Sequence, residues 1–146
     1  MEAVINKKGL FNYEILEKLE AGLKLIGAEV KSLKKGQVSF EGSYISIREG
    51  EAFWVKATIP AFQPKNAPKS YVPERPRKLL LNKKELKYLI GKSQEKGLTI
   101  IPVKVYNKHG LLKLEVGIAR KKKGADKREV LKKRDTDREI RRELKN

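Results

Sequence analysis

The chain has 146 residues, of which 39% are hydrophobic, enough for one compact domain with a modest core and some unpacked chain. Lysine and arginine number 35 against 18 acidic residues, and the resulting net charge of +17 favours a polyanionic partner such as nucleic acid. A thermostable protein with surface ion-pair networks is the alternative, and it fits less well because such networks balance their two signs.

The absence of cysteine excludes disulfides and thiolate metal sites. Residues 1–10 lack the apolar run and the cleavage pattern of a signal peptide. No stretch of the sequence approaches the roughly twenty apolar residues that a membrane span requires. We therefore expect a cytoplasmic, monomeric protein that has no membrane contact.

A short helix is the first element predicted, over residues 12–21, where Ile15, Leu16 and Leu19 share one helical face. After it the hydrophobic pattern changes to the alternation expected of strands with one buried face. These strands are expected around residues 23–25, 38–40, 45–47 and 53–59. Between the last two, a hairpin turn is predicted in which Gly50 takes a positive φ.

The five prolines within residues 60–76 exclude a helix interior and a central strand, so we expect a long loop there. Such a loop is either functional or a plain surface connection. A short buried strand over residues 79–81 should follow, and then a helix that begins at the capping box of Asn82 and Glu85 and ends at Gly91. Two alternating runs, 98–106 and 111–118, complete the pattern as a predicted hairpin.

Several short strands without a βαβ rhythm predict a mainly β fold, a closed antiparallel OB-like barrel with about three short helices. We place this RNA-binding barrel at residues 1–118 and a basic C-terminal tail at residues 119–146. The tail contains 13 basic and six acidic residues but few large aliphatic ones, so it cannot build a core. We expect it to be disordered when free and to fold on RNA phosphate; a plain solubilising tail is the alternative.

Catalytic chemistry finds little support in the sequence. His109 is the single histidine and falls in a predicted hairpin tip, and the acidic residues are scattered among lysines. No Walker loop, nucleophile elbow or dinucleotide fingerprint is present. We therefore expect no cofactor, no metal and no enzymatic activity. Two rivals stay open: a protein that binds ribosomal RNA constitutively, and a metal-dependent nuclease.

Six short motifs carry a resemblance to a known family. They occur in the order Asn6–Lys8, Glu20–Leu23, Gly27–Leu33, Arg77–Lys83, Gly97–Pro102 and Asp126–Arg128. Together they closely resemble the small protein B (SmpB) family of bacterial tmRNA-binding proteins, over nearly the whole chain. The resemblance implies an OB-like barrel that binds the tRNA-like domain of tmRNA and enters stalled ribosomes with it for trans-translation, the rescue and tagging of incomplete proteins. Elongation factor Tu and alanyl-tRNA synthetase are further expected partners, reached through tmRNA.

The same resemblance implies RNA-binding roles for Asn6, Glu20 and Leu80. From the residues alone, Asn6 could instead cap a turn, Glu20 could pair with Lys24 on a helix surface, and Leu80 could belong to the core. With the basic residues within and beside the motifs, the predicted RNA-binding set is Asn6, Lys7, Glu20, Lys24, Lys31, Arg77, Lys78 and Leu80. The candidates for stacking on RNA bases are Tyr13, Tyr44 and Trp54, although aromatic residues more often fill a core.

In the SmpB family the tail reaches the decoding centre of the small ribosomal subunit and the mRNA channel. The resemblance therefore implies a tail that becomes helical on the ribosome. The residues predicted to make ribosome contacts are Lys122, Lys123, Asp126, Lys127, Arg128, Lys132, Lys133 and Arg134. Ala125 stands where the family commonly has histidine or an aromatic residue, so a stacking contact of ~1–3 kcal/mol is missing there.

Overall fold

The computed structural model describes residues 1–63, 65 and 67–123, which form seven strands and three helices. The strands are β1 (Val4–Ile5), β2 (Tyr13–Leu23), β3 (Tyr44–Arg48), β4 (Glu51–Val55), β5 (Arg77–Leu80), β6 (Thr99–Lys108) and β7 (Leu111–Lys121). The helices are α1 (Lys7–Asn12), α2 (Gly27–Lys34) and α3 (Lys83–Ser93). None of the helices in this part of the chain is long and apolar enough to cross a membrane.

All seven strands belong to one antiparallel sheet in the order β1-β6-β7-β2-β5-β4-β3. The prediction of a closed barrel is wrong, because the edge strands β1 and β3 do not pair with each other. Closure requires a continuous ladder of hydrogen bonds. Here β1 has only two residues, and residues 35–43 contribute a single isolated bridge, Ser39 to Thr58. The sheet stays open on this side, where a cleft runs between α1 and residues 38–44.

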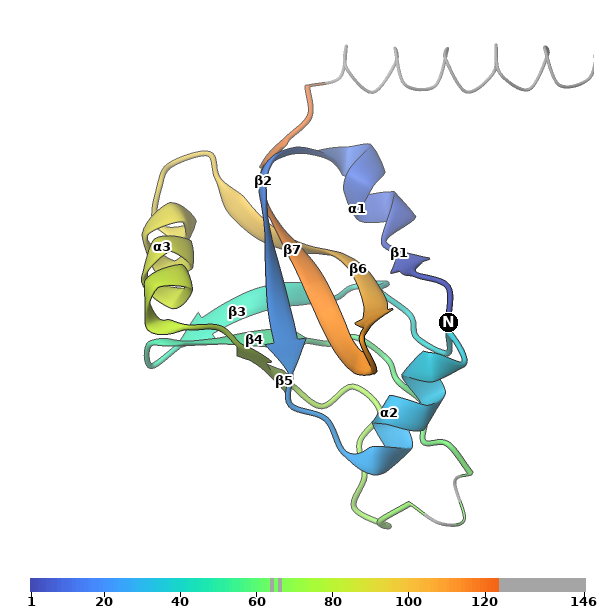
Figure 1. The fold of residues 1–146 in the computed structure, drawn as a ribbon. Helices are drawn as coiled ribbons and strands as arrows, with labels where there is room; N and C mark the ends of the chain where they lie inside the picture. Colours follow the sequence, from blue (N-terminus) through green and yellow to red (C-terminus); the bar gives the residue numbers. More distant parts are fainter. Residues whose placement is uncertain (64, 66, 124–146) are drawn as a thin grey trace, which may run out of the picture.

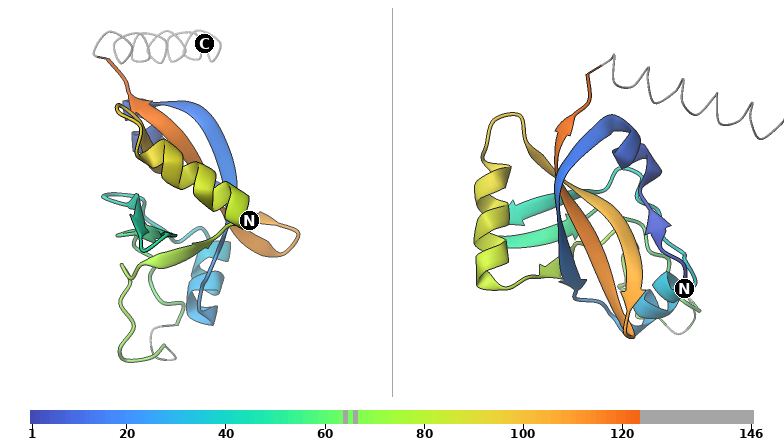
Figure 2. Two further views of the ribbon diagram at one scale, coloured as in Figure 1. Left: turned by 90° about the vertical axis from the view of Figure 1, so that its left-hand side faces the viewer. Right: turned by 45° about the horizontal axis from the view of Figure 1, so that its top comes forward.

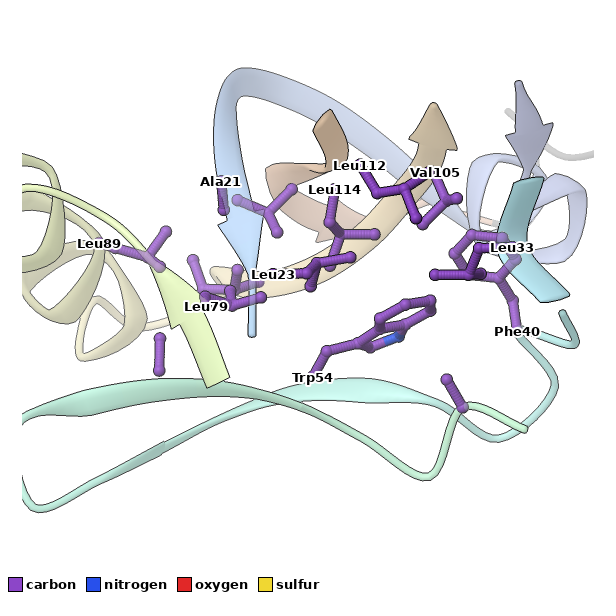
Figure 3. Packing of buried hydrophobic residues seen from close by; sticks show 14 of the residues in the cluster. Ala21, Leu23, Leu33, Phe40, Trp54, Leu79, Leu89, Val105, Leu112 and Leu114 are labelled. Carbon is purple, nitrogen blue, oxygen red and sulfur yellow. The ribbon is translucent and has the colours of Figure 1, made fainter. Parts of the chain in front are cut away.

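The sheet is strongly bent, so that β2, β7 and β6 lie across from β3 and β4 (Figures 1 and 2). β5 joins the two halves by pairing with β2 on one side and β4 on the other. The core fills the space inside the bend. Trp54 is fully buried there, with its ring 5.4 Å from that of Phe40, and Figure 3 shows it among the leucines of β2, β5 and β7. Leu33 of α2 and Leu89 of α3 are also fully buried in this core.

Strand β2 occupies the segment that was predicted to be a helix, and that prediction is wrong. β2 pairs with β7 along most of its length, with a bulge between Ile15 and Glu17 that shifts the phase of the strand. As a result Ile15 packs beneath α1 on the outer side of the sheet, whereas Leu19 packs against the main core. Ile15 and Leu19 are four residues apart, which is the spacing of one helical face, but they lie on opposite faces of the strand.

The predicted helix after Asn82 is confirmed, although it ends at Ser93 and not at Gly91, and both predicted hairpins are confirmed. Asn82 Oδ1 accepts a hydrogen bond from Glu85 N at 2.7 Å, and Glu85 Oε1 accepts one from Asn82 N at 3.2 Å. Gly50 and Gly110 take positive φ angles of 75° and 83° in the two turns. Helices α1 and α2 were not predicted, because with six and eight residues they are too short to show a clear helical period.

Candidate nucleic-acid interface

Strands β2, β7 and β6 bury one side in the main core and turn their other side outward. Part of this outward side is covered by α1, through Leu10 packed with Ile101, Val103 and Ala119. Beyond α1 the surface carries charged and polar side chains from alternate positions of the paired strands, with Leu80 of β5 beside them. We call this surface the outer face; its residues are Lys18, Glu20, Leu80, Lys104, Tyr106, Lys108, Lys113 and Glu115.

Glu20 lies in β2 at the middle of the outer face, directly opposite Glu115 of β7. The Tyr106 hydroxyl donates a hydrogen bond to Glu20 Oε2, and Lys108 Nζ lies 3.4 Å from each carboxylate oxygen. The hydrogen bond from Tyr106, followed by the bond and charge of Lys108, holds the pKa of Glu20 below its ordinary value. Glu20 is therefore a charged acceptor at neutral pH, and its partners are these two residues rather than Lys24.

Glu115 is the second carboxylate of the outer face, but it is only 9% exposed. Lys18 Nζ and Lys104 Nζ each lie 3.3 Å from one of its oxygens, so both lysines partly cover it. The side chain of Glu20, in contrast, is 36% exposed. The face thus combines four lysines that attract anions with one accessible carboxylate that can only accept hydrogen bonds.

Leu80 is on the surface and is 51% exposed, whereas the neighbouring Leu79 is buried. The register of β5 on β2 sets Leu80 opposite Gly22, two residues along β2 from Glu20. A Cβ atom on Gly22 would lie 3.1 Å from Leu80 Cβ, so glycine leaves room for the leucine to lie close to β2. The choice between core and surface is therefore decided for Leu80, which shares the outer face with Glu20.

Arg77 does not fit its predicted role in RNA binding, because it is fully buried. Its Nε donates to Glu29 Oε2 at 2.7 Å, its Nη1 to the carbonyl oxygen of Ala57 at 2.6 Å, and its Nη2 to that of Pro73 at 2.7 Å. The guanidinium group is therefore used inside the protein. Lys78, the next residue, is partly exposed and lies 2.9 Å from Glu51.

Glu29 of α2 is the centre of a buried ion-pair cluster. It accepts hydrogen bonds from Arg75, Arg77 and the backbone nitrogen of Ile26, and Tyr71 donates to it at 3.3 Å. Burial raises the pKa of Glu29, but the hydrogen bonds from Arg75 and Ile26 and the charge of Arg77 outweigh burial and lower it. The cluster ties the end of the proline-rich loop to α2. The motif Gly27–Leu33 contains Glu29, but nothing in the sequence indicates that Glu29 and Arg77 meet.

Comparison with known proteins identifies the family. A family model described as SmpB protein matches residues 3–146. The chain belongs to the SmpB family. The SsrA-binding protein of Thermosipho melanesiensis is 48% identical over 141 residues, which cover 96% of this chain and 95% of that protein. The SsrA-binding protein of Pseudothermotoga lettingae is 45% identical over 146 residues, which cover 99% of this chain and 98% of that protein.

A solved structure also matches this SmpB-family chain. It is described as "tmRNA-SmpB: a journey to the center of the bacterial ribosome" and is 42% identical, with a TM-score of 0.70. The match covers 85% of this chain and 87% of that one. The resemblance drawn from six short motifs is therefore confirmed by comparisons over nearly the whole chain.

Asn6, which the resemblance to the SmpB family predicts to bind RNA, caps helix α1. Its Oδ1 accepts from Gly9 N at 3.1 Å, and its Nδ2 donates to the carbonyl oxygen of Pro102 at 2.8 Å. The backbone nitrogen of Asn6 also donates to Val103 O at 2.8 Å. The alternative that Asn6 caps a turn is confirmed. Asn6 also fixes α1 to β6, at the covered end of the outer face.

The remaining basic residues predicted for SmpB-like RNA binding lie on other elements. Lys7 is exposed on α1, Lys24 is exposed just after β2, and Lys31 is exposed on α2, with its Nζ 5.8 Å from the Phe62 ring. Within the described part of the chain, no hydrogen bond or ion pair joins these lysines to Glu20 or Leu80. The structure thus brings together Glu20 and Leu80, with Lys78 on the same side of β5 as Leu80, and leaves Asn6, Lys7, Lys31 and Arg77 elsewhere.

Two further sets of predictions concern the aromatic residues and the tail. Trp54 is a core residue and is not available for stacking, whereas Tyr44 is 43% exposed. Of the tail residues, Lys122 donates from Nζ to Leu10 O at 3.1 Å and from its backbone nitrogen to Asn12 O at 2.9 Å, and Lys123 is exposed. The others lie outside the described residues: Asp126, Lys127, Arg128, Lys132, Lys133 and Arg134.

Proposed function

We propose that this SmpB-family protein binds the tRNA-like domain of tmRNA and delivers it to stalled ribosomes for trans-translation. In this proposal the C-terminal tail enters the decoding centre of the small subunit and the mRNA channel. Elongation factor Tu and alanyl-tRNA synthetase meet the protein through tmRNA. The observation that carries the proposal is the outer face, where Glu20 and Leu80 are both exposed among four lysines.

The residues of the outer face contribute to RNA recognition in different ways. Lysines attract RNA phosphate without selecting a sequence or a fold. The carboxylate of Glu20 repels phosphate and accepts hydrogen bonds, so it selects a 2′-hydroxyl or the N–H edge of a base. Leu80 adds apolar surface against which a ribose or a base face can pack. A folded RNA that presents these groups together is bound in preference to one that presents phosphate alone.

We propose binding without a catalytic step. Membership of the SmpB family supports this assignment. Among the residues that the structure describes, no three His, Cys, Asp or Glu residues gather in a possible metal site. His109 is exposed in the turn between β6 and β7 and has no acid or base partner in that part of the chain.

The test is equilibrium binding of the purified full chain to tmRNA and to an ordinary elongator tRNA, titrated over salt. Attraction to phosphate weakens steeply with salt, with a logarithmic slope of ~0.7–0.9 per phosphate contact. We expect the preference for tmRNA to persist at high salt, because the contacts of Glu20 and Leu80 do not depend on counterion release. Equal, salt-sensitive binding to both RNAs would contradict the proposal and favour a generic basic RNA-binding protein.

A further inference from the structure

Tyr106 is a residue of the outer face that no sequence motif singles out. It lies in β6, which is separated from β2 by β7, so the backbones that carry Tyr106 and Glu20 are roughly 10 Å apart. Tyr106 is opposite Lys113, while Glu20 is opposite Glu115, two residues further along β7. The phenol therefore extends diagonally over β7 to donate its hydrogen bond to Glu20 Oε2.

We infer that Tyr106 is a positioning residue, which fixes the orientation of the Glu20 carboxylate and so sets the selectivity of the outer face for RNA. The inference rests on the proposed function. A partly exposed glutamate has several rotamers and loses entropy when a ligand orders it. Without Tyr106, the exposed Lys108 would still contact both oxygens at 3.4 Å, but the carboxylate would be free to turn toward Lys113, the other cation near it. With Tyr106, one oxygen is held before RNA arrives, and less of the binding energy is lost to ordering.

A chain of contacts holds Tyr106 itself in place. Lys104 Nζ lies 5.4 Å from the centre of the Tyr106 ring, within the range of a cation–π contact. Lys104 is in turn 3.3 Å from Glu115 Oε2, and Glu115 is nearly buried. The more buried carboxylate of the outer face, that of Glu115, thus pairs with Lys104, and Lys104 contacts the ring that orients Glu20.

The arrangement leaves Glu20 free to bind a further donor. Tyr106 uses one acceptor position of Oε2, Lys108 donates to both oxygens at 3.4 Å, and a carboxylate offers about four positions in all. Burial, and then the hydrogen bond to Glu20, raise the pKa of Tyr106, so the phenol keeps the proton that it donates. The oriented carboxylate therefore stays an acceptor and excludes phosphate from its own position.

The experiment is a double-mutant cycle with Tyr106→Phe and Glu20→Ala, scored by the ratio of affinities for tmRNA and an elongator tRNA at one salt concentration. Tyr106→Phe keeps the ring and removes the hydrogen bond, and we expect the preference for tmRNA to fall ~3–10-fold. In the Glu20→Ala background the same change should have no further effect, because there is no carboxylate left to orient. Thermal unfolding of each variant verifies that the fold is retained.

Tyr88→Phe is the matched control. The Tyr88 hydroxyl also donates to a carboxylate of β2, that of Glu17, but Tyr88 projects from α3 and not from the outer face. We expect this variant to keep the wild-type preference. A loss in Tyr88→Phe as large as that in Tyr106→Phe would overturn the inference, since any phenol–carboxylate bond on β2 would then have the same effect.

The other outcomes separate the inference from the proposed function. If Tyr106→Phe lowers the preference for tmRNA equally with and without Glu20, Tyr106 contacts RNA directly and the positioning role is wrong. If Glu20→Ala abolishes the preference while Tyr106→Phe leaves it intact, the inference fails and the proposed function stands. If the wild-type chain shows no preference for tmRNA, the proposed function itself fails.

Discussion

Replacing Glu29 by glutamine tests the buried cluster that ties the proline-rich loop to α2. The substitution preserves the size of the side chain and removes the negative charge that Arg75 and Arg77 share. Arg75 is 31% exposed and can regain water, but Arg77 is fully buried and cannot. The variant therefore leaves one uncompensated cation in the interior, and most of the destabilisation should come from Arg77.

The magnitude follows from that burial. Breaking a buried ion pair by removing one partner costs about 3–5 kcal/mol. Domains of this kind are stable by only about 5–15 kcal/mol, so Glu29→Gln should remove a large part of the free energy of unfolding. Because 1 kcal/mol corresponds to several degrees in a domain of this size, we expect the Tm to fall by roughly 10 °C or more.

Urea unfolding followed by tryptophan fluorescence measures the effect, since Trp54 is the single tryptophan and is fully buried. Glu51→Gln is the matched control, because it breaks the Lys78–Glu51 pair, in which both side chains are well exposed. The control should lose at most about 1 kcal/mol. A loss of less than 1 kcal/mol in Glu29→Gln as well would show that Arg77 does not depend on Glu29.

The same cluster predicts a pH dependence. The pKa of Glu29 is lower in the folded protein than its ordinary value of 4.5, so the stability that it contributes is fully present above that value. The contribution is lost as the pH falls through the lower, folded pKa. We therefore expect the unfolding free energy of the wild-type protein to decrease below pH 4.5 more steeply than that of Glu29→Gln. Parallel curves would contradict this origin of the acid sensitivity.

Two further predictions concern α1 and the tail. Asn6→Ala removes the cap of α1 and the hydrogen bond to Pro102, so it should lower the free energy of unfolding by about 1–2 kcal/mol. This loss should exceed that of Asn82→Ala, which removes only the cap of α3. Equal losses in urea unfolding would mean that the hydrogen bond to Pro102 contributes nothing. Truncation after Lys123 keeps all of β7 and the contact of Lys122 with Leu10. It should preserve tmRNA affinity while abolishing tagging in a reconstituted translation assay. Loss of both activities would show that residues 124–146 also serve tmRNA binding. Truncation from Ala119 is unsuitable for this test, because Ala119 is fully buried in β7.

Local signals in the sequence predicted the elements that local chemistry determines. The capping box at Asn82 and Gly50 of the first hairpin turn each act within a few residues, and both were confirmed. The closure of the sheet could not be predicted in this way, because it depends on whether β1 and β3, 40 residues apart in the sequence, pair with each other. The bulge in β2 is likewise invisible in the pattern of one strand, since its partner β7 lies about 100 residues away.

The residues of the candidate site could likewise be predicted from the sequence only in part. The motifs identified Glu20 and Leu80, but their joint position on the outer face depends on the pairing of β2 with β5. A positive charge within a motif did not indicate RNA binding at Arg77, because the sequence does not reveal that Arg77 pairs with Glu29 in the interior. Tyr106 was missed because its partner is 86 residues distant and no helical or strand period connects the two.

The most direct test of the account compares Leu80→Ala with Leu16→Ala, a leucine of similar exposure at the bulge of β2. Affinities for tmRNA and for an elongator tRNA are measured at one high salt concentration. About half of the Leu80 side chain is exposed, so burying it against RNA should contribute about 1 kcal/mol, and its loss should weaken tmRNA binding about fivefold. We predict this loss for tmRNA in Leu80→Ala, with Leu16→Ala unchanged. Unchanged tmRNA affinity in Leu80→Ala, or an equal loss in both variants, would contradict the claim that the outer face recognises tmRNA.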